Sequence, residues 1–163
     1  MTIREQAARM KLDSPKMAAT DITVRNAALE KIAEALLTNK ESIFEANEKD
    51  MERARAEEIS PAVIKRLKFS ETKLTDAVAG IHNLIELPDP LFQIQLKRQL
   101  DEGLTLVRET CPIGVIGVIF EARPDAMVQI ASLCIKSGNC AILKGGSETL
   151  GKPLTGKDRQ GYL

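Results

Sequence analysis

Two short polar segments, each placed directly after an apolar run, carry the residues best suited to chemistry. The segment 121–124 reads Glu-Ala-Arg-Pro and follows the run 113–120; the segment 144–148 reads Lys-Gly-Gly-Ser-Glu and follows the run 140–143. The planar guanidinium of Arg123 suits a carboxylate or a phosphate. Paired glycines let the backbone approach a ligand, beside a lysine that can meet a phosphate or a ribose hydroxyl. These residue types indicate an anionic ligand with nucleotide-like features.

Each segment also has an ordinary structural interpretation. Glu121 and Arg123 can form an ion pair that closes the end of a strand, and exposed pairs of this kind contribute little to stability. The second segment can be a glycine turn between a strand and a helix, with Lys144 and Glu148 in solvent. It matches neither GxGxxG nor GxxxxGK followed by Ser or Thr, so its spacing does not establish a standard dinucleotide or P-loop site. The residues alone leave these alternatives open.

The pattern around the two segments predicts a βαβ unit over residues 112–148. The run 113–120 is apolar on both faces, as in a parallel strand that helices cover on both sides. Pro124 can begin a helix that ends near Ser137, with Gly138 and Asn139 as its left-handed cap. Its inward residues are predicted to be Met127, Ile130, Ala131, Cys134 and Ile135. Because ligands bind beyond the carboxyl ends of parallel strands, both polar segments should face one crevice.

Residues 1–87 are predicted to form a layer of helices. Apolar residues at helical spacing mark two buried stripes, one of Val24, Ala28, Ile32 and Leu36 and one of Leu74, Val78, Ile81 and Ile85. Asn39 should end the first of these helices, Ser60 and Ser70 should cap later ones, and Leu-Pro-Asp-Pro at 87–90 should stop the last. Alternating residues over 92–110, with a turn at 101–103, predict a half-exposed two-stranded ribbon. The predicted fold class is α/β.

Composition excludes several classes of function. The 23 basic and 23 acidic residues cancel, so the chain lacks the positive field expected of a nucleic-acid partner. No apolar run approaches the ~20 residues of a membrane span, and the first residues do not resemble a secretion signal, which predicts a cytoplasmic protein without a membrane partner. The cysteines and the single His82 show no metal-ligand spacing, and no metal is predicted. His82 lies outside the apolar stripe and should face solvent.

The segment 112–148, PIGVIGVIFEARPDAMVQIASLCIKSGNCAILKGGSE, closely resembles the nucleotide-binding part of the γ-glutamyl phosphate reductase (glutamate-5-semialdehyde dehydrogenase) family of the aldehyde dehydrogenase superfamily. The stretch EANEKDM at 45–51 matches as well, so the resemblance covers residues 1–149. Glu-Ala-Arg-Pro after the first strand marks this branch, because the wider superfamily has a Pro-Trp-Asn-like sequence there. The resemblance implies a partial dinucleotide-binding domain over 1–149, made of the helical layer 1–87, the ribbon 92–110 and the βαβ unit.

The resemblance implies an oxidoreductase of proline biosynthesis that uses NADPH to reduce L-glutamyl 5-phosphate to L-glutamate 5-semialdehyde. In this family a cysteine thiolate displaces the phosphate, and hydride from the cofactor then reduces the thioester. Arg123 and Glu121 align with the loop near the substrate and the nicotinamide. The cofactor-binding residues carried over by the resemblance are Lys144, Gly145, Gly146, Ser147 and Glu148. The nucleophilic cysteine is expected beyond residue 163, so no catalytic role is expected for Cys111, Cys134 or Cys140.

The last residues depart from the family pattern. Residues 150–163 contain three glycines and a proline where the family has an alanine-rich helix, which predicts a divergent, disordered tail. With the catalytic domain absent, the chain is expected to be a truncated form that is inactive alone. The alternative is a non-enzymatic fragment that acts by associating with a full-length partner. The ribbon 92–110 is the predicted surface for a homo-oligomer.

Overall fold

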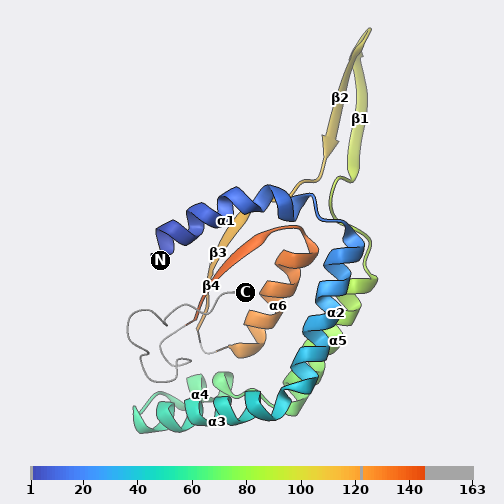
Figure 1. Cartoon of the computed structure of the whole chain (residues 1–163). Coiled ribbons are helices and arrows are strands. Elements are labelled where there is room, and N and C mark those ends of the chain that lie inside the picture. The colour runs from blue at the N-terminus through green and yellow to red at the C-terminus, as the bar shows by residue number, and fades with distance from the viewer. Residues whose placement is uncertain (1, 122, 146–163) are drawn as a thin grey trace.

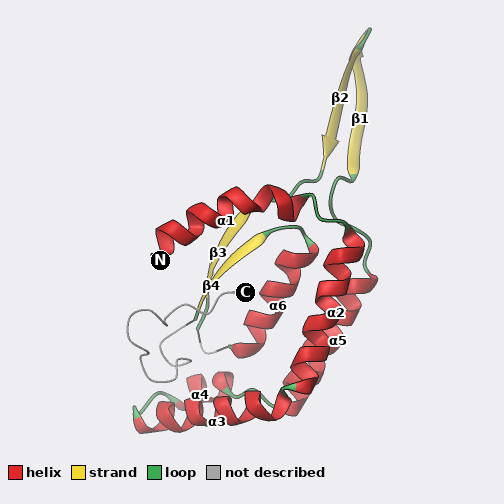
Figure 2. Ribbon diagram, viewed as in Figure 1, coloured by secondary structure: helices red, strands yellow, loops and turns green. Residues whose placement is uncertain are grey.

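The computed structural model describes residues 2–121 and 123–145 (Figure 1). Helices and strands follow one another in the order α1 (Ile3–Ala18), α2 (Ile22–Thr38), α3 (Lys40–Ala56), α4 (Pro61–Leu67), α5 (Glu71–Glu86), β1 (Ile94–Asp101), β2 (Leu104–Glu109), β3 (Val115–Ile119), α6 (Pro124–Lys136) and β4 (Cys140–Lys144). Helices, a small parallel sheet and an antiparallel ribbon make up the described residues (Figure 2). The predicted α/β class is confirmed.

Local signals at the helix ends are those expected from the sequence, with one exception. Ser70 caps α5, because its Oγ accepts a hydrogen bond from the Lys73 N–H at 3.4 Å, and α5 ends at Glu86, just before Leu-Pro-Asp-Pro. Asn39 follows the last residue of α2. Ser60, however, makes no capping hydrogen bond. The start of α4 depends instead on Pro61, whose fixed φ suits the first helical position.

The main core lies where α2, α5 and α6 pack together. Its buried residues are Leu29, Ala33, Phe69, Leu74, Ala77, Val78, Ile81 and Val128. The predicted buried stripe on α5 is confirmed. In the first turns of α2, however, the buried residues lie one position later than predicted. Val24 is 58% exposed, whereas Arg25 and Leu29 are buried. The buried face of α2 includes the charged Arg25, so a search for apolar residues at helical spacing does not find it.

A smaller core joins α3 to α4. Met51, Ala54 and Leu67 are buried there. Asn47 fixes the chain beyond α4, because its amide donates to the Leu67 carbonyl at 2.9 Å and accepts from the Phe69 N–H at 2.7 Å. Both bonds are buried, so they are shielded from competing water.

The predicted βαβ unit is confirmed. Strands β3 and β4 are parallel neighbours joined through α6, with Val115 opposite Cys140 and Ile119 opposite Lys144. Helix α6 contacts β4, and α1 contacts both strands. Complete burial of β3 was a wrong prediction, since Ile119 is 78% exposed. The two described strands therefore leave apolar surface uncovered near the carboxyl end of β3.

The buried face of α6 overlaps the predicted one and extends beyond it. Ala131 and Cys134 point inward as expected, whereas Met127 is 42% exposed. Val128, Ser132 and Lys136 are buried instead, each four residues from the next. Two of these residues are polar, so a stripe drawn from apolar residues alone could not find them.

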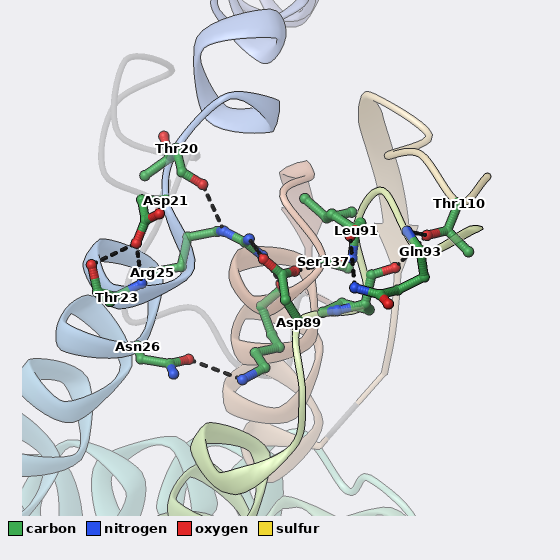
Figure 3. Close-up of polar contacts among 12 residues, drawn as sticks. Thr20, Asp21, Thr23, Arg25, Asn26, Asp89, Leu91, Gln93, Thr110 and Ser137 are labelled. Atoms are coloured by element: carbon green, nitrogen blue, oxygen red, sulfur yellow. Dashed lines mark hydrogen bonds and ion pairs between the residues drawn. The ribbon is translucent and has the colours of Figure 1, made fainter.

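Two buried cations hold α6 against α2 and the end of α5 (Figure 3). The guanidinium of Arg25 donates to the carbonyls of Thr20 and Lys136 and pairs with Asp89 at 2.6 Å. The ammonium of Lys136 donates to Asn26 Oδ1 at 3.0 Å. It also donates to two carbonyls at the C-terminal end of α5, Ile85 at 3.1 Å and Leu87 at 2.7 Å. We call this group the cation clasp, and burial within it lowers the pKa of Lys136 from its ordinary value.

A turn with a glycine connects α6 to β4. Gly138 has φ of +65°, and a Cβ added there would lie 2.7 Å from Leu91 Cδ1. Asn139 then links this turn to β3, because its Oδ1 accepts from the Gly114 N–H at 2.8 Å. The predicted glycine cap is confirmed, and Asn139 adds a bond between strands that sequence reasoning did not foresee.

Strands β1 and β2 form a ribbon that projects from the rest of the chain (Figure 1). Every residue of both strands is exposed. Pairing of Leu96 with Arg108 and of Arg98 with Leu106 puts leucines and arginines on one face. The predicted ribbon is confirmed, and it is more exposed than the half-exposed ribbon expected.

Replacing Lys136 by Met should destabilise the chain by about 2–4 kcal/mol. The substitution removes the donor to Asn26 Oδ1 and to the Leu87 carbonyl, while the Ile85 carbonyl keeps the Asn26 amide at 3.4 Å. An unpaired polar group costs about 1–3 kcal/mol when it is buried. Urea unfolding followed by circular dichroism measures the loss. The matched control is Lys31→Met, since Lys31 is 77% exposed and pairs only with nearby Glu34; it should change stability by less than about 0.5 kcal/mol. Equal effects of the two substitutions would contradict a structural role for the clasp.

Candidate functional site

The carboxyl ends of β3 and β4 bring the two polar segments to one edge of the sheet. Ile119 lies opposite Lys144, and the Phe120 N–H donates to the Lys144 carbonyl at 3.0 Å. Glu121 follows immediately and is exposed. The sequence therefore correctly predicted that the first residues of the two segments, Glu121 and Lys144, share an edge. Since parallel strands end in register here, polar side chains from both can meet one ligand.

Arg123 stands at the start of α6. It is the residue before Pro124, its side chain is 57% exposed, and its guanidinium pairs with Asp125 at 3.3 Å. The ion pair considered from the sequence was with Glu121, and the structure gives Asp125 as the partner instead. Free backbone N–H groups at a helix start favour anions. Arg123 thus presents positive charge at the same edge as Lys144, partly offset by Asp125 in the first turn of α6.

A third residue at this edge, Lys73 of α5, was missed by the sequence analysis. Its ammonium lies 3.4 Å from Asp125 Oδ1 and donates to the Arg66 carbonyl at 2.9 Å. The contact spans 52 residues of sequence, so no local pattern marks it. Lys73 connects the last turn of α4 and the first turn of α5 to the first turn of α6.

Lys144 is exposed at the end of β4, and its ammonium donates to the carbonyl of the adjacent Gly145 at 3.2 Å. This weak local contact leaves donor capacity for a ligand. Gly146, Ser147 and Glu148 lie outside the described residues, as does the predicted tail 150–163. The structure thus describes Lys144 and Gly145 of the five predicted cofactor residues.

The three thiols lie away from the polar edge. Cys140 begins β4, about 13 Å of strand from Lys144. Cys134 is in the last turns of α6, about 16 Å of helix from Arg123. Cys111 precedes the amino end of β3. Burial raises the pKa of the Cys134 and Cys140 thiols, which lowers their thiolate fraction near neutral pH.

The described residues give no support for a metal site or for a functional role of His82. Within residues 2–121 and 123–145, no three His, Cys, Asp or Glu side chains gather to hold a metal ion. His82 is 48% exposed and lies 3.5 Å from Glu30, in agreement with its predicted position facing solvent. Among the helices described, none combines the length and apolar content needed to cross a bilayer.

Curated relatives resemble the chain over most of its length. It is 51% identical over 148 residues to a γ-glutamyl phosphate reductase of Acetivibrio thermocellus, a match that covers 91% of this chain and 34% of the relative. A γ-glutamyl phosphate reductase of Synechococcus elongatus is 57% identical over 126 residues, or 77% of this chain and 29% of the relative. The chain spans about a third of the length of these relatives. No protein-family model matches it.

Solved structures agree with this result. The γ-glutamyl phosphate reductase of Saccharomyces cerevisiae superposes with a TM-score of 0.86 at 38% identity, over 91% of this chain and 38% of the yeast chain. The enzyme of Thermotoga maritima gives a TM-score of 0.83 at 31% identity, over 89% of this chain and 35% of that chain. The family resemblance is therefore confirmed: this chain is similar in sequence and fold to about a third of γ-glutamyl phosphate reductase.

Proposed function

We propose that this chain forms the cofactor and substrate edge of an NADPH-dependent reductase that converts L-glutamyl 5-phosphate to L-glutamate 5-semialdehyde. The observation that carries the proposal is the pairing of Ile119 with Lys144, because it puts the residues after both strands at one edge. The similarity to γ-glutamyl phosphate reductases supports the choice of reaction. The proposed reaction is an oxidoreductase step of proline biosynthesis.

In this proposal Arg123 binds the anionic end of the substrate. Its guanidinium is exposed and directly precedes the start of α6. A planar fork can donate two parallel hydrogen bonds to a phosphate or carboxylate, and the helix start adds favourable N–H groups. Glu121, two residues earlier, is also exposed, and its carboxylate would accept a hydrogen bond from the substrate or cofactor.

The proposed cofactor is NADPH, which supplies hydride when bound. Lys144 fits this role by position and charge, because its ammonium is exposed at the strand end and its partner among the described residues is the local Gly145 carbonyl. It would contact the adenine ribose and its phosphate. Gly145 follows with no side chain to obstruct the ligand. Gly146, Ser147 and Glu148 are proposed as further contacts on the basis of the family resemblance.

The proposed reaction needs a thiol to displace phosphate from the acyl group, giving a thioester that hydride reduces to the aldehyde. None of the three thiols in this chain is proposed for that step. Two are buried or half-buried with raised pKa values, and all lie toward the opposite end of α6 and the strands. Displacement of a reacting group by even about 1 Å can cost ~10²-fold in rate.

A second role, association with another copy or a full-length relative, is favoured by the ribbon. All of its residues are exposed, including the leucines at 96, 104 and 106. Isolated two-stranded ribbons are marginally stable in water, and their open edges can pair with another strand. We propose the ribbon as a self-association surface. This role is compatible with the reductase and also stands alone as a non-enzymatic one.

Lys144→Met should weaken NADPH binding by about three- to tenfold while Arg123→Lys should leave it within about twofold. The first change removes the charge facing the cofactor, whereas the second keeps the charge at the substrate loop. Fluorescence titration of the 163-residue chain with NADPH measures both, with Lys97→Met on the exposed ribbon as the charge-matched control. Unchanged affinity in Lys144→Met would refute the assigned cofactor contact.

The 163-residue chain alone should show no phosphate-dependent, NADP⁺-linked oxidation of glutamate 5-semialdehyde, the reverse of the proposed reaction. The reason is the distance of its thiols from the polar edge. The assay follows absorbance of NADPH and includes a folded triple variant with Ser at positions 111, 134 and 140. Turnover by the parent chain that disappears in this variant would identify one of these thiols as the nucleophile and contradict the proposal.

Leu106→Asp should lower the apparent mass of the chain if the ribbon mediates self-association. The carboxylate removes apolar area from the leucine-rich face, and it would have to lose its bound water when two ribbons associate, which is unfavourable. Light scattering after size-exclusion chromatography, over a range of concentrations, measures the mass. The control is Thr105→Asp, which places the same charge on the opposite face of the strand. A parent chain that is monomeric throughout would remove the ribbon from the proposed interfaces.

A further inference from the structure

Asp125 lies between two cations that come from distant parts of the chain. Its Oδ1 is 3.4 Å from Lys73 Nζ, and its Oδ2 is 3.3 Å from Arg123 Nη2. The Asp125 side chain is 15% exposed, Lys73 is 31% exposed and Arg123 is 57% exposed. Asp125 in the middle is the least exposed of the three and Arg123 the most exposed, so the guanidinium is the member that a ligand can reach most easily.

The charges of this triad determine what Arg123 offers to an anion. Arg123 and Asp125 alone form a neutral pair, in which the carboxylate competes with any anion for the guanidinium. Lys73 adds a second positive charge on the other carboxylate oxygen. The triad then carries a net positive charge, and part of the hydrogen-bonding capacity of Asp125 is directed away from Arg123.

Lys73 is itself held in place. Its ammonium also donates to the Arg66 carbonyl at 2.9 Å, at the C-terminal end of α4 where carbonyls lack helical partners. This second bond fixes the lysine between α4 and α6. A long lysine side chain restrained in this way loses less entropy when it contacts Asp125.

We infer that Lys73 is a positioning residue for Arg123: through Asp125 it orients the guanidinium and keeps it available to an anionic substrate group. This inference rests on the proposed function, in which Arg123 binds that group. Lys73 reaches the guanidinium through the Asp125 carboxylate, so most of its influence on anion binding should disappear when the Asp125 side chain is truncated to Ala. If Lys73 acted only on the fold, through its bond to the Arg66 carbonyl, its effect on anion binding would be the same with or without that carboxylate.

A double-mutant cycle separates the two roles. The Nε–Hε signal of Arg123 is followed by NMR while the 163-residue chain is titrated with inorganic phosphate. The variants are Lys73→Met, Lys73→Arg, Asp125→Ala and the double variant of Lys73→Met with Asp125→Ala. Lys73→Gln, whose amide retains a donor for the Arg66 carbonyl, replaces Lys73→Met if that variant is poorly folded. The backbone amide spectrum reports folding, and Lys68→Met, on an exposed lysine close in sequence, is the charge control.

We expect Lys73→Met to weaken phosphate binding at Arg123 by about three- to tenfold, Lys73→Arg to restore it within about twofold, and Lys68→Met to leave it unchanged. In the Asp125→Ala background, Lys73→Met should change the affinity by less than about twofold. If Lys73→Met weakened phosphate binding equally in both backgrounds, or in neither, the inference about Lys73 would be overturned while the proposed function would stand. A wild-type Arg123 signal that does not respond to phosphate would overturn the anion role of Arg123 in the proposed function, and the inference with it.

Discussion

The cation clasp is the interaction on which the arrangement of the chain depends. Two fully buried charges are costly to remove from water unless hydrogen bonds compensate them. Here the compensation comes mainly from backbone carbonyls of three separate segments, at Thr20, Ile85 and Lys136. Because those carbonyls must converge for the charges to be satisfied, the clasp fixes how α2, α5 and α6 meet. Apolar contacts among the same helices are less directional and would tolerate other angles.

Fixing α6 at one end has a consequence at the other. The clasp holds its C-terminal end, where Lys136 is the last residue, while its first turn carries Asp125 beside Arg123. A helix is stiff over 13 residues, so an anchored C-terminus limits where the N-terminus can lie. Asn139 then ties the following turn to the start of β3. Helix and strands together therefore present the polar edge as one unit, with its cationic groups on rigid elements.

Sequence reasoning recovered the elements better than their buried faces. Prolines, capping residues and alternation identified the βαβ unit, the end of α5 and the ribbon, because these signals act within a few residues. The faces of α2 and α6 were misjudged where Arg25, Ser132 and Lys136 are buried. At the site, the shared edge followed from parallel pairing, whereas Asp125 as the partner of Arg123 and Lys73 as its neighbour did not. The contact between Lys73 and Asp125 spans 52 residues, so no local pattern in the sequence predicts it.

The clasp also bears on how the polypeptide folds while it is being synthesised. Arg25 bonds a carbonyl 111 residues later in the chain, and at about 5–20 residues per second that carbonyl is made roughly 6 to 22 s after Arg25. During this interval the buried face of α2 carries a hydrated guanidinium next to Leu29. Burying a charge without its partners is costly, which disfavours close packing on this face before those partners are made. Arg25 can therefore complete the packed layer only after residue 136 has been made.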